Sequence, residues 1–257
     1  MERFIGLWTI EFFWGVIPWF LFFASFAYLL RFLLKGKEKT KIWILRGIAI
    51  AILVLEVAKQ VVSLSKGYSL YHLPFHYCSL FLLVLPFHAF SFGKFKKYVD
   101  GISFATLTSL FFVYMIVPTV LYPKENFSEY FTNFFSFHTI TFHHLVVLYL
   151  FLAIAFGSFK LKLKRDFPIC AIFLSIFVII STALSYTLSV NYHNLLKSNV
   201  DLIENNIRVP LNNALGWGGQ AIYVALMFVF TTVIAYLAYL LISLFYKYVA
   251  KGKATVK

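Results

Sequence analysis

Long apolar runs, separated by short segments rich in lysine and arginine, follow one another along the whole chain. A helix needs about 20 residues to cross the roughly 30 Å of hydrocarbon in a bilayer, and each run is long enough to do so. The pattern therefore predicts an all-α, polytopic integral membrane protein with about seven transmembrane helices in one bundle. The predicted helices occupy residues 12–34, 42–65, 70–90, 98–121, 132–156, 167–190 and 218–246.

Two segments depart from this regular pattern. The third run, 70–90, contains Pro74 and Pro86 among its apolar residues, together with three histidines. The segment 191–217 is polar and contains Pro210 and the start of a glycine-rich stretch. We predict that this second segment is a long polar loop folded back onto the helices. The whole chain, residues 1–257, is predicted to form a single transmembrane domain.

The composition excludes a soluble globular protein. Hydrophobic residues make up 61% of the chain and charged residues only 13%, and the mean hydropathy is +0.82. Soluble domains carry about a quarter charged residues. The net charge of +13 does not indicate nucleic-acid binding, because the basic residues lie in short clusters between apolar runs. Membrane lipids are the expected surroundings and partner.

The distribution of basic residues predicts how the protein is oriented. Of the 23 lysines and arginines, 17 fall at one face of the predicted bundle and 6 at the other, alternating loop by loop. Cytoplasmic loops are enriched in these residues. We therefore predict an outside N-terminus, a cytoplasmic C-terminus and a multi-pass location in the cell membrane. Cys78 and Cys170 then lie near opposite faces, so we expect no intramolecular disulfide.

Polar residues of four predicted helices fall in one layer, in the outer half of the bilayer. Ionisable groups in hydrocarbon cost several kcal/mol unless they are paired, so they mark function by default. Their convergence predicts a single polar cavity open to the outer leaflet. The residues are Glu56, Lys59, His72, His76, Cys78, Ser79, Ser136, His138, Thr139, His143, His144, Asn191, Tyr192 and His193.

Each of these signals also has a purely structural interpretation. A cysteine such as Cys78 often packs as a small buried residue, and intramembrane histidines often bond neighbouring helices. Glu56 and Lys59, three residues apart, suit a structural ion pair as well as a catalytic role. His72 and His76 share a face of an ideal helix, but no carboxylate lies in the same turn. We therefore predict no metal and no cofactor. Cys170, without polar companions, is interpreted as structural.

The segment 73–78 reads LPFHYC and resembles the LP-x-H-x-C signature of the bacterial YwaF-like integral membrane proteins. The resemblance extends over most of the chain, in the order and spacing of several short elements. These are Glu56-Val57-Ala58-Lys59, Pro118, Phe142-His143, Asn191-Tyr192, and Leu215-Gly216 followed by Tyr223. The chain departs from the family at residues 216–218, which read GWG where the family commonly has Gly-Pro with Trp.

A distant eukaryotic relative of that family is a cysteine-dependent acyltransferase that makes ether phospholipids. The resemblance implies that Cys78 is the acyl-accepting nucleophile and that His143 is its histidine partner. Three histidines, at 138, 143 and 144, occur together in this chain. The choice of partner among them therefore stays open.

Our leading hypothesis is an acyltransferase or hydrolase that acts on lipid esters. A Cys78 thiolate attacks the carbonyl, His143 acts as base and acid, and His76, Asn191 or Tyr192 bonds the oxyanion. A metal-dependent enzyme that uses the histidines is a variant of this hypothesis.

The first alternative is a proton-coupled transporter, with the intramembrane ionisable residues as a relay. The chain shows no internal repeat, and its predicted inner half lacks matching polar residues for a through-path. The second alternative is a non-enzymatic membrane protein with a structural polar core.

Overall fold

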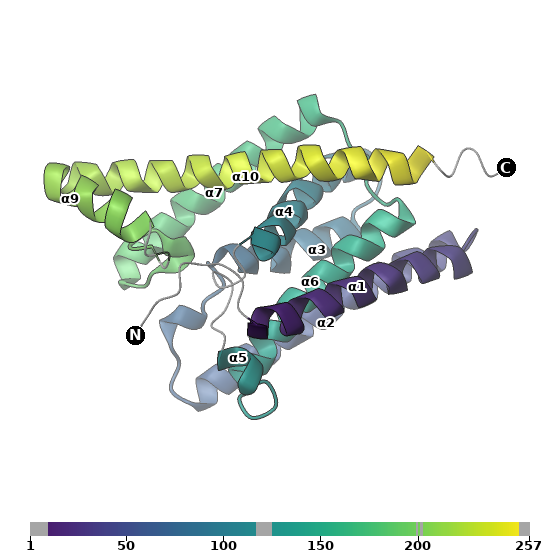
Figure 1. Cartoon of the computed structure of the whole chain (residues 1–257), viewed down its shortest axis with the longest axis horizontal. Coiled ribbons are helices and arrows are strands. Elements are labelled where there is room, and N and C mark those ends of the chain that lie inside the picture. Colours follow the sequence, from purple (N-terminus) through teal and green to yellow (C-terminus); the bar gives the residue numbers. More distant parts are fainter. Residues whose placement is uncertain (1–9, 117–124, 199, 201–202, 252–257) are drawn as a thin grey trace.

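The computed structural model describes residues 10–116, 125–198, 200 and 203–251, and every regular element in these ranges is a helix (Figure 1). The long helices are α1 (Ile10–Leu33), α2 (Glu38–Ser65), α4 (Lys96–Ile116), α6 (Phe134–Phe156), α7 (Leu163–Leu188) and α10 (Trp217–Lys251). The shorter elements are η1 (Leu70–His72), η2 (Tyr77–Leu80), α3 (Phe81–Phe90), α5 (Glu125–Ser128), η4 (Tyr192–Asn194), η5 (Glu204–Arg208) and α9 (Val209–Leu215).

Six helices in the described part of the chain are long and apolar enough to cross a membrane. They correspond to six of the predicted runs, with ends that differ by a few residues. The predicted all-helical, polytopic membrane fold is thus confirmed, while the orientation of the termini stays a prediction. The predicted end of the fourth run, including Pro118, lies outside the described residues.

The third predicted run is a broken segment rather than one continuous helix. Leu73, which precedes Pro74, has an extended backbone (φ −61°, ψ 142°), as steric conflict with a following proline requires. His76 is extended as well (φ −76°, ψ 156°). Regular α-helix begins only at Phe81. The expectation that His72 and His76 share one helical face is therefore wrong, because the backbone between them is not helical.

This broken segment nevertheless lies antiparallel to α2 along most of that helix. Near one end, the carbonyl of His72 accepts a hydrogen bond from Gln60 (2.8 Å) and its ring meets Ser63 (2.6 Å). Near the other end, Arg46 donates to the carbonyl of Ala89 (3.2 Å). Ser63 follows Arg46 by 17 positions, which is about 26 Å along the helix. The segment 72–89 therefore covers most of the thickness of a bilayer.

The segment 191–217 is not simply a loop, which corrects the prediction for its second half. Residues Glu204–Arg208 form a π-helical turn that continues into α9. Pro210 lies in the first turn of α9, where a missing backbone N–H costs little. Gly216 ends α9 with φ +54°. α9 and the start of α10 thus form a helical hairpin.

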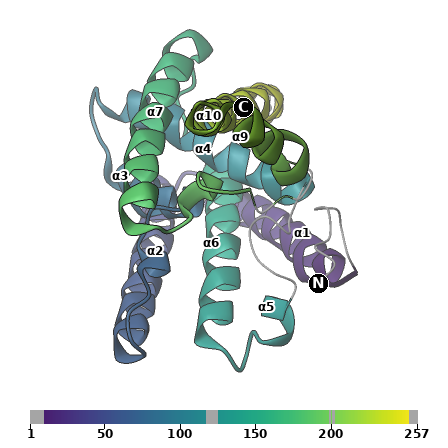
Figure 2. The ribbon, with the colours of Figure 1, turned by 90° about the vertical axis from the view of Figure 1, so that its left-hand side faces the viewer.

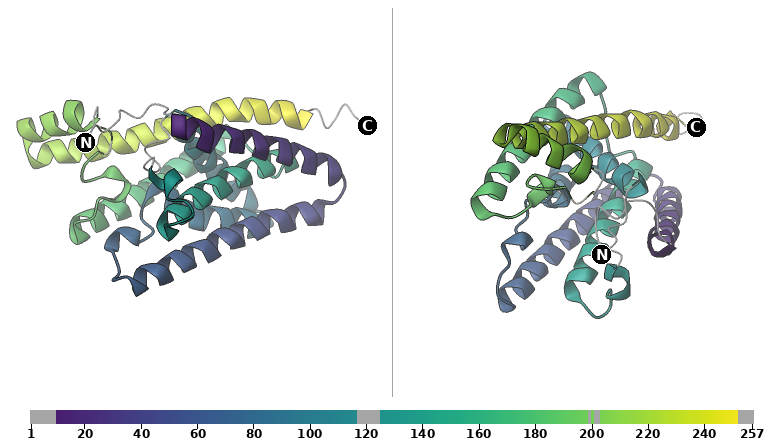
Figure 3. Two further views of the ribbon diagram at one scale, coloured as in Figure 1. Left: turned by 60° about the horizontal axis from the view of Figure 1, so that its bottom comes forward. Right: turned by 60° about the vertical axis from the view of Figure 1, so that its left-hand side comes forward.

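The helices α4 and α6 form the centre of the bundle. About 67% of the apolar window of α4 and 72% of that of α6 are buried, against 17–22% in the other four long helices. α6 lies between α1 and α2 (Figure 2), and α4 packs against α7 and α10. Figure 3 shows α2 and α10 on the outside of the bundle. The outer helices thus expose apolar surface, as lipid contact requires.

Local signals in the sequence set the ends of α6. Asn133 is the N-cap, and its side-chain oxygen accepts a hydrogen bond from the N–H of Phe135 (3.0 Å). Gly157 ends the helix in the left-handed conformation (φ 68°), which glycine adopts without strain.

We call the end of the bundle with the segments 34–37, 91–95 and 157–162 the basic end. A carboxylate there lies at the junction of three helices. Asp166 of α7 is 1% exposed and accepts hydrogen bonds from the Tyr239 hydroxyl of α10 (2.7 Å) and the N–H of Lys162 (2.7 Å). It packs directly on Gly101 of α4, where an added Cβ would lie 2.6 Å from the Asp166 Cγ atom.

A second buried carboxylate lies beside it on α4. Asp100 is fully buried and accepts hydrogen bonds from the Lys96 ammonium (2.5 Å) and the N–H of Lys160 (3.0 Å). The Nε2 atom of His88 lies 3.4 Å from it, and Nδ1 of that ring meets the Tyr149 hydroxyl (2.6 Å). The expectation that the inner half lacks polar residues matching those of the outer half is therefore wrong.

The close packing at Gly101 gives a first prediction. Gly101→Ala places a methyl group against the Asp166 carboxylate, so we expect a loss of about 1–3 kcal/mol in stability from overpacking. Gly47→Ala is the matched control, because nothing lies within 4 Å of its added Cβ and it too is in a long helix. Thermal unfolding of detergent-solubilised protein measures both. Equal melting temperatures for the two variants would contradict the prediction.

Candidate functional site

A buried ion pair on α2 forms the centre of a polar cluster near the end of the bundle opposite the basic end. The Glu56 Oε1 atom lies 2.7 Å from the Lys59 ammonium, and Oε2 lies 3.3 Å from Nε2 of His138 on α6. All three side chains are at most 13% exposed. A charge buried in an apolar bundle is strongly unfavourable unless an opposite charge neutralises it. Glu56 therefore joins two potential cations from two helices.

Neutral groups extend this cluster toward the broken segment. The Gln60 side chain donates to Glu56 Oε1 (2.6 Å) and accepts from the Tyr68 hydroxyl (2.7 Å). Ser63 bonds Nδ1 of His72 (2.6 Å). Gln60 lies four residues after Glu56 and therefore shares its helix face, so this spacing could have indicated Gln60 as a member of the cluster. Gln60, Ser63 and Tyr68 are thus additions to the predicted site.

Cys78 belongs to η2 of the broken segment. The side chain is partly buried against the core, within electrostatic interaction range of Lys59, Glu56 and Tyr71. No histidine in the described part of the chain hydrogen-bonds the thiol. An ammonium is therefore the nearby charge that would stabilise a thiolate at this position.

The three neighbouring histidines of α6 have different surroundings. His138 faces Glu56, as described above. His143 donates from Nδ1 to the Thr139 carbonyl of its own helix (2.7 Å) and lies near the Tyr114 ring of α4 (6.1 Å). The cluster thus includes His138 directly, and His143 lies one to two turns farther along α6.

His144 belongs to another contact. Its Nε2 atom lies 3.2 Å from the Gly15 carbonyl of α1, and its ring packs edge-on against Trp19, Phe20 and Phe23. The structure thus does not bring His144 into the predicted cavity, because its helix face points at α1.

His76 and Tyr192 meet across the end of the cluster. The His76 Nε2 atom donates to the Tyr71 carbonyl (3.1 Å), and its ring lies 4.4 Å from that of Tyr71 and 5.3 Å from that of Tyr192. The Tyr192 hydroxyl donates to the carbonyl of Leu70. These contacts fasten the segment 189–198 to the broken segment, and they occupy the Tyr192 hydroxyl.

Asn191 is committed to its own loop. Its side-chain oxygen accepts from the N–H groups of Leu196 (3.0 Å) and Lys197 (3.2 Å), and its nitrogen donates to the Lys197 carbonyl (2.9 Å). An oxyanion role for Asn191 or Tyr192 would require these bonds to break. Both residues therefore act here as structural ties.

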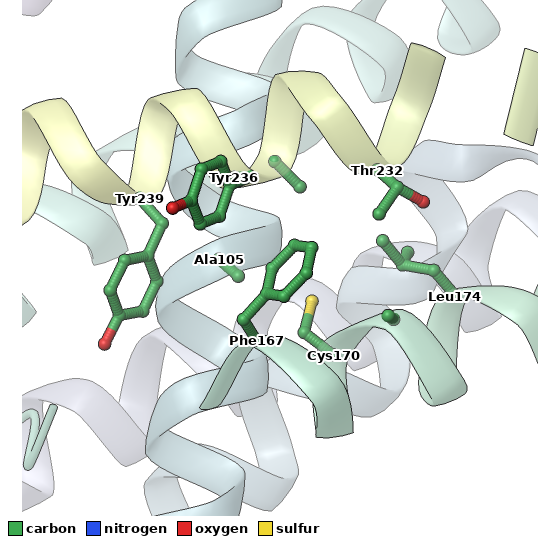
Figure 4. Close-up of a pocket in the computed structure, with 9 residues that line it drawn as sticks. Ala105, Phe167, Cys170, Leu174, Thr232, Tyr236 and Tyr239 are labelled. Atoms are coloured by element: carbon green, nitrogen blue, oxygen red, sulfur yellow. The ribbon is translucent and has the colours of Figure 1, made fainter. Parts of the chain in front are cut away.

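Two further features concern metals and the second cysteine. Within the described ranges, no three His, Cys, Asp or Glu side chains lie close enough together to hold a metal ion. Cys170 lines a small apolar crevice between α4, α7 and α10 (Figure 4), among residues such as Leu174, Tyr236 and Tyr239. These apolar and aromatic neighbours are those of a structural cysteine.

The ion pair gives a second prediction. Glu56→Gln leaves the Lys59 ammonium buried without its carboxylate, which typically costs about 3–5 kcal/mol. Replacing Lys59 with Met in the same protein removes the stranded charge and should recover most of that loss. Glu38→Gln is the control: it breaks an ion pair of the same spacing on α2 whose carboxylate is 70% exposed, worth at most about 1 kcal/mol.

Thermal unfolding in detergent compares the four proteins. A double variant that is as unstable as Glu56→Gln alone would contradict the account of a stranded charge.

Comparison with known proteins gives one match. A family model, that of the TMEM164 family, matches residues 7–241. No curated protein and no solved structure matches the chain. The match agrees with the multi-pass membrane fold, since this is a family of membrane proteins. The cell membrane as the specific location stays a prediction.

Proposed function

Because the chain belongs to the TMEM164 family of membrane proteins, we propose that its polar cluster performs acyl chemistry within the bilayer. In this proposal the protein is an acyltransferase or hydrolase of lipid esters, with Cys78 as nucleophile. The resemblance to YwaF-like proteins, and through them to the ether-phospholipid acyltransferase, is part of what motivates the proposal. The observation that carries it is Glu56, which contacts both His138 and Lys59 beside the thiol.

The charge near the thiol supports a nucleophilic role. The thiolate, not the thiol, attacks a carbonyl. Lys59 is held by Glu56 at 2.7 Å within electrostatic range of Cys78. In a medium of low polarity an ammonium attracts a thiolate far more strongly than it would in water. The Lys59 ammonium thus offsets part of the cost of burying a thiolate at Cys78.

The contact between Glu56 and His138 supports a role in proton transfer. A carboxylate that bonds one imidazole nitrogen fixes the tautomer of the ring and stabilises its protonated form. The Nε2 atom of His138 lies 3.3 Å from a Glu56 carboxylate oxygen, within ion-pair distance but without hydrogen-bond geometry, whereas the Nδ1 atom of His143 donates a hydrogen bond to a backbone carbonyl. Of the histidines left open by the sequence, we therefore assign His138 as acid and base.

The proposed reaction has two steps. First the Cys78 thiol gives its proton to His138 and its sulfur attacks the ester carbonyl carbon. A carbon–sulfur bond forms, the carbon–oxygen bond breaks, and the departing alcohol takes the proton from His138. Then an acceptor hydroxyl gives its proton to His138 and attacks the thioester. The carbon–sulfur bond breaks and the thiol regains its proton. Water as acceptor makes the reaction a hydrolysis.

The depth of the cluster suits a lipid ester. Glu56 lies nine residues before the end of α2 at Ser65, which is about 14 Å along the helix. The hydrocarbon core of a bilayer is about 30 Å thick, and ester linkages lie at its boundary. A carbonyl at that boundary is between two and three helical turns from Glu56.

A proton-coupled transporter is the second candidate, and the buried polar cluster at the basic end favours it. His88, Asp100 and Lys96 there mirror the cluster around Glu56. Between the two clusters, however, α6 carries the buried apolar residues Phe142 and Val146. Proton flux into liposomes that is abolished by Asp100→Asn would favour the transporter over the enzyme.

The enzyme proposal predicts a covalent acyl intermediate. Purified protein incubated with a phospholipid that carries an alkyne-tagged acyl chain should acquire a label that hydroxylamine removes, as it does a thioester. Cys78→Ser should lose the hydroxylamine-sensitive label, whereas Cys170→Ser, the control in the apolar crevice, should keep it. Intact labelling of Cys78→Ser would overturn the proposal.

The partner assignment is tested in the same assay. A positioned acid–base group contributes about 10²–10⁴-fold to rate, so His138→Gln should slow labelling by at least about 100-fold. His143→Gln should slow it only a few-fold. If His143→Gln instead slows labelling more than His138→Gln does, His143 is the acid–base group, as the family resemblance implies, and Cys78 stays the nucleophile.

A further inference from the structure

A groove lies outside the polar cluster, where the end of α7, the segment 189–198 and the hairpin of α9 and α10 meet. Its volume is about 330 Å³, which is within the size range of small-molecule sites. The lining residues are Tyr186, Leu196, Asn212, Gly216, Trp217 and Gln220. It is at the end of the bundle opposite the basic end, because α7 ends and α10 begins there.

Two aromatic rings form one wall of this groove. Trp217 is 80% exposed, and its ring centroid lies 5.9 Å from that of Tyr186 at an angle of 44°. Trp217 is also the first residue of α10, at the point where an apolar helix enters the membrane. We therefore infer that the wall lies near the membrane surface.

An amide group with an unused acceptor lies in the same groove. The Asn212 nitrogen donates to the Gln220 side-chain oxygen (2.8 Å), and the Gln220 nitrogen donates to the Leu195 carbonyl (2.9 Å). Gln220 is only 8% exposed, so this arrangement is fixed. The Asn212 oxygen is buried and has no hydrogen-bond partner within the residues that the structure describes. A buried acceptor of this kind requires a donor.

The groove carries no net charge. None of its lining residues is ionisable except Tyr186. Arg208 and Glu204 lie beside the lining and pair with each other, and Arg208 also donates a hydrogen bond to the Gln220 side-chain oxygen (3.4 Å). Hydrogen bonds from Arg208 lower the pKa of Glu204, so the carboxylate stays ionised and the pair stays neutral overall. Neither an anion nor a cation is favoured as the occupant.

The groove is built on close backbone packing. A Cβ added at Gly219 would lie 2.1 Å from the Leu211 carbonyl oxygen, so α9 and α10 approach each other only because glycine is there. Gly216 adopts φ +54°, a backbone conformation that residues other than glycine rarely adopt. The wall and the amide are therefore held in place before any ligand binds.

We propose that this groove binds the neutral sugar ring of a glycolipid headgroup. The apolar C–H face of a pyranose stacks on an aromatic wall, and its hydroxyl groups supply the donor that the Asn212 oxygen lacks. The uncharged lining disfavours phosphate and ammonium groups. The position of Trp217 at the membrane surface favours a sugar anchored in lipid over a free one. This inference is independent of the acyl chemistry proposed above.

The test measures, by native mass spectrometry, the binding of monoglucosyl diacylglycerol to the purified full-length protein. Trp217→Leu should weaken binding at least about tenfold. Asn212→Leu should weaken it about fivefold, the effect of one ordinary hydrogen bond. The controls are Trp14→Leu, another exposed tryptophan on α1, and Asn213→Leu, an exposed neighbour on α9 that does not line the groove. Both controls should bind as the unmodified protein does.

Two competitors distinguish the source of the sugar. Phosphatidylglycerol, which lacks the ring, and methyl glucoside, which lacks the lipid, should each compete at least about tenfold more weakly than the glycolipid. Equal binding of phosphatidylglycerol, equal competition by methyl glucoside, or equal binding by all four variants would each overturn the proposal. Trp217→Phe keeps a smaller aromatic ring and should bind with intermediate affinity. This graded result would show that weak binding by Trp217→Leu reflects the lost ring and not a misfolded protein.

Discussion

The exclusion of water from the bundle interior is the constraint on which the remaining features of the structure depend. A buried charge in such an interior must be neutralised by its immediate neighbours. The described part of the chain meets this requirement at three buried carboxylates. Lys59 neutralises Glu56, Lys96 neutralises Asp100, and Arg165 neutralises Asp166. Glu56 also faces His138 of α6, and Asp166 accepts a hydrogen bond from Tyr239 of α10. The helices are thus fastened near both ends, and the polar residues gather there.

Much of the fold follows from the sequence alone, because hydrophobic length is a strong signal. Six long helices and the polar layer were predictable from apolar runs and their spacing. The failures have local causes. Pro74 extends the backbone before it, and periodicity cannot show which residues then lose their common face. Residues 204–215 form helical turns, but they are too polar to be predicted as helix from an apolar run.

The sequence placed Glu56, Lys59 and His138 in one polar layer but did not give their pairings, and it did not indicate Gln60, Ser63 or Tyr68. Which histidine of α6 faces Glu56 depends on the rotation of that helix about its axis, and a single sequence does not specify it. His138 and His144 point to α2 and to α1, respectively. Asp100 and Asp166 escaped prediction because they lie at helix starts, where carboxylates are common and usually exposed. Asp166 is buried partly because Gly101 of α4 lets it pack directly on the helix backbone.

The broken segment decides whether the chain crosses the membrane an even or an odd number of times. An even number of crossings leaves both ends of a chain on the same side of the membrane, and an odd number leaves them on opposite sides. Residues 72–89 run beside α2 for most of its length, and the predicted total of seven passages is reached only when this segment is counted with the six long helices. The side reached by the C-terminus therefore rests on the least regular stretch of the chain, which a search for long apolar helices alone would omit.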